Sequence, residues 1–147
     1  MRAGGLPDLP AVVRLLQAAG LPTADLRGAP AFDLWVIEAD AALIGAIGLK
    51  RFEKSALLRS LVVVPEYRRH GLGRQLVEQL ERVARMSGID RLVLLTETAE
   101  GFFAGLGYSV TDRESVPAAV KGSAEFRTLC PVSAACMTKS LLAQQRA

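Results

Sequence analysis

A chain of 147 residues, half of them hydrophobic and 22% of them charged, can bury the core of one domain and does not have the composition of a disordered protein. A formal charge of +3 is too small to indicate a nucleic-acid-binding protein, although it suits a small anionic ligand. No apolar run approaches the roughly 18 residues that cross a bilayer, and the start lacks a hydrophobic signal core, so we expect a soluble, cytoplasmic protein without a membrane partner.

The first half of the chain contains one helical segment and three strand-like segments. Apolar residues recur at helical spacing over residues 6–19, where a glycine and a proline end the helix, and a loop is expected over residues 21–31. Strand-like runs follow at 32–39, 42–52 and 55–64, separated by short turns. Their close spacing favours an antiparallel meander, and the nearly apolar third run is expected at the centre of the sheet.

The second half alternates helices and strands. We expect a helix from residue 72 to near Gly88, strands at 91–96, 108–112 and 135–142, a short helix closed by Gly107, and an irregular connection over 113–131. The predicted order is strand, helix, loop, three strands, helix, strand, helix and two strands. This order predicts an α+β (mixed α/β) fold with one mixed sheet of six to seven strands, helices on both faces and a right-handed crossover.

The bend PEYRRHGLGRQL, at residues 65–76, is the clearest candidate site. It leaves a buried strand, contains two glycines and enters a helix, whose first N–H groups and dipole attract anions. The glycines let a phosphate approach the backbone, and three arginines and a histidine add positive charge. A solvated basic turn is the alternative. The bend is not a P-loop, because no GKS or GKT follows, and it lacks the third glycine of a Rossmann fingerprint.

LVVVPEYRRHGLGRQLV resembles the acetyl-CoA binding motif of the GNAT N-acetyltransferases, written [Arg/Gln]-x-x-Gly-x-[Gly/Ala] and present here as RRHGLG. A second motif of that family, Phe-Tyr-x-x-x-Gly-Phe, is matched by FFAGLGY at residues 102–108. The resemblance implies a single GNAT domain over residues 1–147 that uses acetyl-CoA and no metal. It implies that the cofactor contacts Leu61, Val62, Val63, Arg68, Arg69, His70, Gly71, Leu72, Gly73, Arg74 and Phe103.

The resemblance also implies the chemistry: a neutral amine attacks the thioester, and backbone N–H groups stabilise the oxyanion. The family often has a tyrosine that protonates the departing thiolate, but Phe103 stands there. Either the thiolate leaves without a side-chain acid, or another group serves, with Tyr108 favoured as a core residue instead. Glu53 and Glu97 are the candidate bases, and ordinary solvated turn charges are the alternative for both.

The substrate implied by the resemblance is a small amine. Arg59, Arg51 and Arg127 are candidates for pairing with a substrate carboxylate or phosphinate, and Arg59 stands out because it interrupts an apolar strand. EFRTLCPVSAACM, ALLRSLVV and TETAEGFF resemble the arsenic-resistance branch of the family, whose members act on amino-acid-like toxins. Small members of the family often pair, so a homodimer is also compatible.

Two alternative functions stay open at this point. One is a protein that binds acetyl-CoA without turnover, suggested by the missing tyrosine. The other is an arsenic- or metal-binding protein that uses Cys130 and Cys136, although two thiols make a poor metal site without a third ligand, and buried inert cysteine is the commoner outcome.

Overall fold

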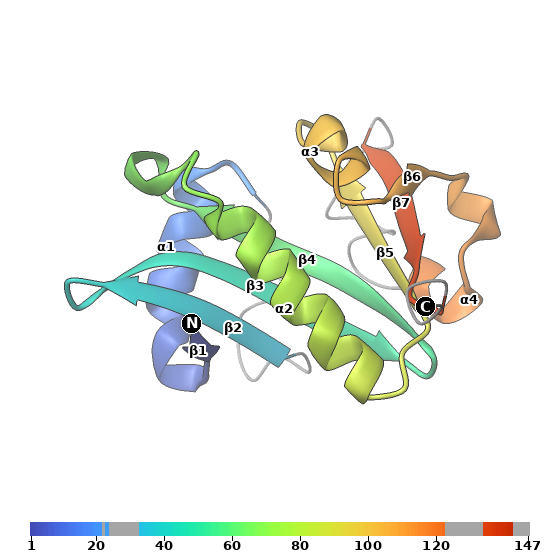
Figure 1. Cartoon of the computed structure of the whole chain (residues 1–147), viewed down its shortest axis with the longest axis horizontal. Helices are drawn as coiled ribbons and strands as arrows, with labels where there is room; N and C mark the ends of the chain where they lie inside the picture. Colours follow the sequence, from blue (N-terminus) through green and yellow to red (C-terminus); the bar gives the residue numbers. More distant parts are fainter. Residues whose placement is uncertain (22, 24–32, 123–133, 143–147) are drawn as a thin grey trace. The chain divides into compact units, whose positions relative to one another are not determined.

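The computed structural model describes residues 1–21, 23, 33–122 and 134–142, and within them seven strands form one mixed sheet in the order β1-β2-β3-β4-β5-β7-β6 (Figure 1). The strands are β1 (Arg2–Ala3), β2 (Asp33–Ala39), β3 (Ala42–Phe52), β4 (Ser55–Val63), β5 (Arg91–Thr96), β6 (Ser109–Val110) and β7 (Ala135–Ser140). The α-helices are α1 (Leu9–Ala18), α2 (Leu72–Met86), α3 (Glu100–Ala104) and α4 (Ala118–Lys121), with 3-10 turns at Leu6–Asp8, Pro65–Tyr67 and Arg113–Ser115. None of the helices in these ranges is long and apolar enough to cross a membrane.

The observed order confirms the predicted α+β class. Strands β2 and β3 are antiparallel, whereas β4 and β5 are parallel and are connected through α2. Strand β4 is the middle strand of the sheet, as its apolar sequence predicted. Two details differ. Strand β6 keeps only two residues of the expected five-residue strand, and the connection expected to be irregular contains α4. The four residues of α4 are too few for helical periodicity to be visible in the sequence.

The chain divides into two compact units, formed by residues 1–50 with 59–82 and by residues 51–58 with 83–147. In the first unit, α1 packs through Val12 and Leu16 on a cluster that includes Ala46 of β3. Helix α2 covers the opposite face, because a Cβ added to the neighbouring Gly45 would lie 3.3 Å from the Cδ1 of Leu76. Successive strand residues point to opposite faces, so helices cover both faces here, as predicted (Figure 1).

The second unit has its own core beneath β5 and β7. Leu57, Val93, Val116, Val120 and Cys136 form one buried cluster. Leu92 and Leu94 are at most 1% exposed and point to the other face from Val93, so β5 is covered on both sides. A strand buried on both faces must be a continuous apolar run, which explains the sequence RLVLLT.

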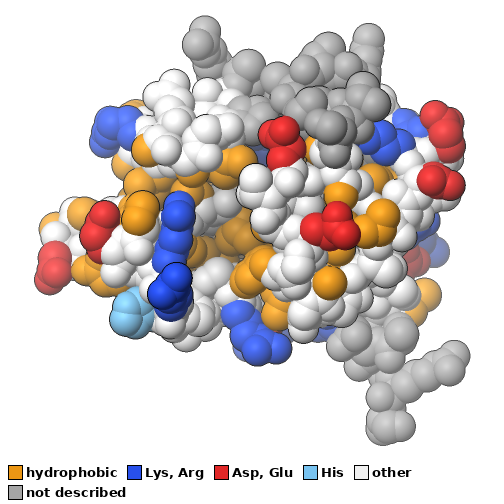
Figure 2. Space-filling model, turned by 90° about the horizontal axis from the view of Figure 1, so that it is seen from above, with side chains coloured by type: hydrophobic (Ala, Val, Ile, Leu, Met, Phe, Trp, Pro, Cys, Tyr) orange, Lys and Arg blue, Asp and Glu red, His pale blue; other side chains and the backbone are white. Residues whose placement is uncertain are grey.

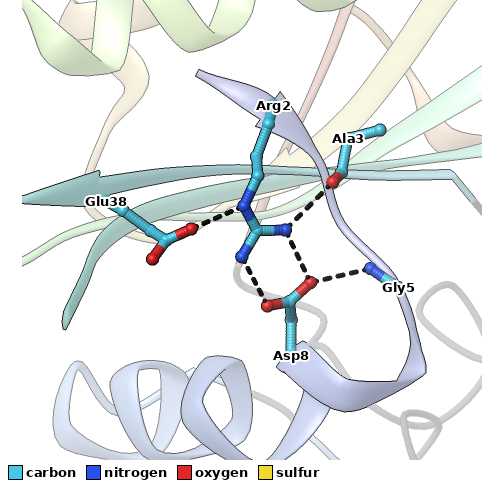
Figure 3. Close-up of polar contacts among 5 residues, drawn as sticks. All are labelled: Arg2, Ala3, Gly5, Asp8 and Glu38. Carbon is cyan, nitrogen blue, oxygen red and sulfur yellow. Dashed lines mark hydrogen bonds and ion pairs between the residues drawn. The ribbon is translucent and has the colours of Figure 1, made fainter. Parts of the chain in front are cut away.

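An ion-pair network fastens the N-terminus to the first unit (Figure 3). The Arg2 guanidinium donates to both carboxylate oxygens of Asp8, at 2.8 and 3.0 Å, and to Glu38 of β2. Asp8 also accepts the backbone N–H of Gly5 at 2.8 Å. The hydrogen bonds from Arg2 and then from Gly5 lower the pKa of the Asp8 carboxyl.

This network predicts an acid-sensitive N-terminus. Because the pKa of Asp8 is lower in the folded chain than in the unfolded chain, its stabilisation is present above the unfolded pKa and is lost as the pH falls through the folded pKa. We expect Asp8→Asn to lower the thermal midpoint slightly at pH 7, since exposed ion pairs contribute little, and to have no effect at a pH below the folded pKa. Thermal unfolding of both proteins across pH checks this, and an equal difference at every pH would contradict it.

Candidate functional site

The basic bend leads into the N-terminus of α2. The carbonyl of Gly71 accepts the N–H of Gln75 at 3.0 Å, which makes Gly71 the N-cap residue immediately before α2. The N–H groups of Leu72, Gly73 and Arg74 therefore have no acceptor within the helix. The dipole of a helix of this length adds partial positive charge at the same end. The arrangement is suited to binding an anion through backbone amides.

Two residues of the bend have left-handed backbone torsions. Arg69 has φ 70° and Gly71 has φ 76°. For arginine such a torsion costs about 1–3 kcal/mol, so the surrounding structure must enforce it. A Cβ added to Gly71 would meet nothing within 4 Å, so the space above this glycine is open. Left-handed residues next to free amides form concave anion-binding turns, and the bend has that form.

Positive side chains surround these amides. Arg68, Arg69, His70 and Arg74 are all exposed, and Figure 2 shows Lys or Arg side chains gathered beside a histidine, of which the chain has one. Arg74 pairs with Glu78 at 3.4 Å along the helix surface. Arg68 points elsewhere, because its Nε–H donates to the carbonyl oxygen of Val63 at 2.9 Å. The sequence predicted the charges of the bend but not this last contact.

Strand β4 leads into the bend and changes character along its length. Its parallel pairing with β5 covers Ser55–Leu57 and Arg91–Val93, whereas β4 itself runs on to Val63. Ser60 has φ 58°, which marks an irregularity in the strand beyond that pairing. Val62 packs into the α1 core at 5% exposure, and its neighbours Leu61 and Val63 are half-buried. The backbone of Leu61–Val63 is therefore outside the β4–β5 ladder, as a strand that receives an extended ligand requires.

Arg59 is the one arginine among the buried polar residues of the described chain, with 7% exposure. Its Nε–H donates to the hydroxyl oxygen of Ser60 at 3.1 Å. A buried guanidinium needs polar partners to offset its desolvation, and the Ser60 hydroxyl is one of them. The sequence singled out Arg59 but not Ser60, whose only signal was that it follows Arg59 in the same interruption of the apolar run.

The aromatic residues of the second motif lie together in the second unit. Phe103 is buried at 4% exposure and packs edge-to-face on Phe102 and Tyr108, with ring centroids 5.1 and 5.5 Å apart. Tyr108 is 3% exposed, and the Nζ of Lys139 lies 5.4 Å from its ring centroid. The prediction that Tyr108 is a core residue is confirmed. Lys139 also donates to the carbonyl of Leu106 at 2.8 Å, which stabilises the end of the α3 turn.

The other candidates are scattered. Glu53 is exposed in the β3–β4 turn with φ 60°, Glu97 is exposed just after β5, and Arg51 is exposed at the end of β3. Exposure keeps the solvated-charge interpretation of both glutamates open. Arg127 and Cys130 lie outside the described residues.

Cys136 is buried at 3% exposure, and burial raises the pKa of its thiol despite the charges of Arg113 and Arg91. A neutral buried thiol is a poor soft-metal ligand. Among the described residues there is no group of three or more His, Cys, Asp or Glu side chains that could hold a metal ion. These observations do not favour the cysteine-based alternative.

The state of Cys136 can be measured directly. In Cys130→Ser it is the only thiol, and we expect its alkylation at pH 8 to be slower in the native protein than in denaturant, because burial shields the sulfur and raises the pKa of the thiol. The rate should increase with pH beyond the range in which an exposed thiol reaches its plateau. Equal rates in the native and denatured protein would contradict the burial of this side chain.

Comparison with known proteins places this geometry in a family. Residues 30–110 match the acetyltransferase (GNAT) domain family. The chain is 33% identical over 105 residues to an uncharacterised N-acetyltransferase of Chlorobaculum tepidum, covering 71% of this chain and 65% of that protein. It is 34% identical over 86 residues to the amino-acid acetyltransferase of Pseudomonas putida, covering 57% of this chain and 20% of that protein. The chain thus spans less than two thirds of the length of these relatives.

Solved structures with the same fold include N-acetylglutamate synthase from Neisseria gonorrhoeae complexed with coenzyme A and N-acetyl-glutamate. It matches with a TM-score of 0.77 and 22% identity, over 96% of this chain and 34% of that protein. An N-acetyltransferase from Thermoplasma acidophilum in complex with coenzyme A matches with a TM-score of 0.67 and 18% identity, over 95% of this chain and 99% of that protein. The match to the family covers more than half of the chain, and the fold agrees with it: the chain belongs to the GNAT acetyltransferase domain family.

Proposed function

We propose that residues 1–147 form one acetyl-CoA-dependent N-acetyltransferase domain that acetylates the primary amine of a small, amino-acid-like molecule. The observation that carries this proposal is the start of α2, where free amides, an open glycine and exposed positive side chains converge in a chain of the GNAT family. Coenzyme A carries a diphosphate, which is the kind of anion that such amides bind.

The remaining cofactor contacts follow from this placement. In the proposal, residues 69–74 bind the pyrophosphate, and the backbone of Leu61–Val63 pairs with the pantetheine arm as an added strand would. That backbone is extended and lies outside the β4–β5 ladder, which supports the assignment. Phe103 is the proposed apolar contact of the cofactor. These contacts use hydrogen bonds and apolar surface, so no metal is required.

The proposed reaction needs few catalytic side chains. A neutral amine attacks the thioester carbonyl, the tetrahedral oxyanion is stabilised by backbone N–H groups, and the C–S bond breaks to release coenzyme A as a thiolate. A thiol pKa of about 8.5 makes the thiolate an adequate leaving group without an acid, which suits the phenylalanine at position 103. Glu53 or Glu97, directly or through water, takes the proton of the ammonium. Positioning supplies much of the remaining rate enhancement.

An amino-acid-like substrate is supported by Arg59 and by the relatives. A buried guanidinium can form two parallel hydrogen bonds to a carboxylate or phosphinate. We propose Arg51 and Arg127 as the further substrate contacts. Several relatives are described as amino-acid acetyltransferases. Within this class we propose the toxin-directed substrates of the arsenic-resistance branch, because of the segments that resemble it.

Titration calorimetry with acetyl-CoA tests the proposal first, and absence of binding at high micromolar concentration would overturn it. A thiol-release assay then compares proteinogenic amino acids, a phosphinothricin-type amino acid, an arsenical amino acid and the corresponding amines without an acidic group. We expect turnover to require both the amine and the acid. If only the proteinogenic amino acids are turned over, the protein is an acetyltransferase but the toxin-directed role is excluded.

Binding of acetyl-CoA with no turnover of any amine would favour the non-catalytic alternative, which the phenylalanine at position 103 keeps open. The cysteine-based alternative makes a different prediction. Replacing Cys130 and Cys136 with serine should abolish arsenic protection in cells if the thiols bind arsenic, and should leave it nearly unchanged if the protein acts by acetylation.

A further inference from the structure

We propose that Arg68 is a positioning residue that holds the anion-binding bend in shape through the carbonyl of Val63, and that it does not bind the pyrophosphate. This inference rests on the proposed function for its effect on coenzyme A. The contact itself lies within the protein and involves no ligand: the Nε–H of Arg68 donates to the carbonyl oxygen of Val63 at 2.9 Å.

Val63 and Arg68, which share this hydrogen bond, lie on either side of a sharp turn. Val63 is the last residue of β4, and Pro65–Tyr67 form a single 3-10 turn. Within that turn the N–H of Tyr67 donates to Val64 at 3.0 Å, and the N–H of Arg68 donates to Pro65 at a longer 3.3 Å. The side chain of Arg68 therefore closes a ring over the turn and joins the start of the bend to the end of the strand.

The peptide group that accepts the hydrogen bond from Arg68 is itself held in place by the sheet. The N–H of Val64 donates to the carbonyl of Ile44 in β3 at 2.9 Å, so the peptide group between Val63 and Val64 is held on both sides. One side is the sheet, and the other is Arg68. Arg68 thus joins the bend to a peptide group that is also hydrogen bonded to the sheet.

The residues that follow explain why an anchor is needed. Arg69 and Gly71 both adopt left-handed torsions, and Arg69 does so without the freedom of glycine. A short exposed segment with such torsions relaxes unless its ends are fixed. Fixing the bend before the ligand arrives keeps the amides at the start of α2 aimed outward and reduces the ordering that binding requires.

The atom that donates makes the proposal testable. The Nε of arginine is bonded to Cδ, and the Nε2 of glutamine is also bonded to Cδ, so Arg68→Gln keeps an N–H at the same point while removing the charge. Arg68→Lys keeps the charge but moves the donor one bond further along the side chain. Arg68→Met keeps an unbranched side chain that reaches the position of Nε with a methyl group, and removes both the donor and the charge.

We expect Arg68→Met to raise the Kd for coenzyme A and the KM for acetyl-CoA about five- to tenfold, the effect of one lost hydrogen bond, with kcat unchanged within about twofold. Arg68→Gln should restore most of this affinity, and Arg68→Lys should resemble Arg68→Met. As a matched control one residue along, Arg69→Gln should weaken binding, because Arg69 supplies charge.

Three results would overturn the inference. Strong binding by the lysine variant with weak binding by the glutamine variant would show that Arg68 acts by charge on the phosphate. Wild-type affinity in the methionine variant would show that the contact has no role. A fall in kcat and a rise in the KM for the amine, together with a lower thermal midpoint, would show a general loss of structure.

Amide hydrogen exchange on the ligand-free protein separates this inference from the proposed function. The hydrogen-bonded amides of Val64, Tyr67 and Arg68 should exchange faster in the methionine and lysine variants than in the wild type, and the glutamine variant should restore their protection. If the wild type binds no coenzyme A but shows this pattern, the proposed function fails and the anchoring role stands. If exchange is the same in all four proteins, the anchoring role fails even though coenzyme A binds.

Discussion

Gly71→Glu is expected to weaken coenzyme A binding by at least about 100-fold, because a carboxylate placed in the open space above the bend would meet the pyrophosphate, and juxtaposed like charges cost several kcal/mol. The left-handed torsion at this position adds backbone strain for any residue with a Cβ. Titration calorimetry with coenzyme A measures the loss. Gly71→Ala should show the smaller loss that is caused by strain alone.

The opposite end of α2 provides a matched control for this variant. Gly88 has φ 84°, and a Cβ added there would also meet nothing within 4 Å, so Gly88→Glu introduces the same charge with similar strain. We expect Gly88→Glu to bind coenzyme A like the wild type. Unchanged affinity in Gly71→Glu, or an equal loss in both variants, would mean that the bend does not bind the diphosphate.

Arg59→Lys is expected to raise the KM for an amino-acid substrate at least about tenfold, because lysine keeps the charge but cannot present two parallel N–H donors to a carboxylate. Arg59 is almost completely buried, and its Nε–H donates to Ser60. An exposed ion pair elsewhere on the surface therefore cannot take over its contact with the substrate. The KM for acetyl-CoA should change by less than about twofold, because Arg59 is expected to contact the amino-acid substrate and not acetyl-CoA. Steady-state kinetics with both substrates varied gives the two constants.

Substrate choice sharpens this second test. The amine that corresponds to the amino acid without its carboxylate should be a poor substrate for the wild type and should lose nothing further in Arg59→Lys. Arg14→Lys, on the exposed side of α1, is the control and should behave like the wild type. If both substrates are affected equally by Arg59→Lys, Arg59 stabilises the strand and does not recognise the acid.

Much of the fold was predictable from the sequence because it depends on neighbours along the chain. The apolar run RLVLLT had to be a strand covered on both faces, and the periodic residues after Gly73 had to form a helix with one buried side. Short elements were not predictable. Strand β6 and helix α4 have two and four residues, which is below the length at which a period can be recognised, and their ends depend on packing.

The candidate site divides in the same way. The residue types of the bend, its two glycines and its position between a strand and a helix were present in the sequence, and these predicted an anionic ligand. The sequence also identified Arg59 as unusual, since a charge inside an apolar strand has to find a partner when it is buried.

Only the tertiary structure decided the contacts and torsions of these parts. It showed that Arg68 bonds to Val63, that Arg69 and Ser60 have left-handed torsions, and that the pairing of β4 with β5 covers only part of the strand. A side chain with several donors has many acceptors within reach, and a torsion outside the common regions is stable only when its surroundings enforce it. Both are determined by packing of segments that are distant in the chain, so the local pattern indicates an anion site but does not assign a role to each arginine.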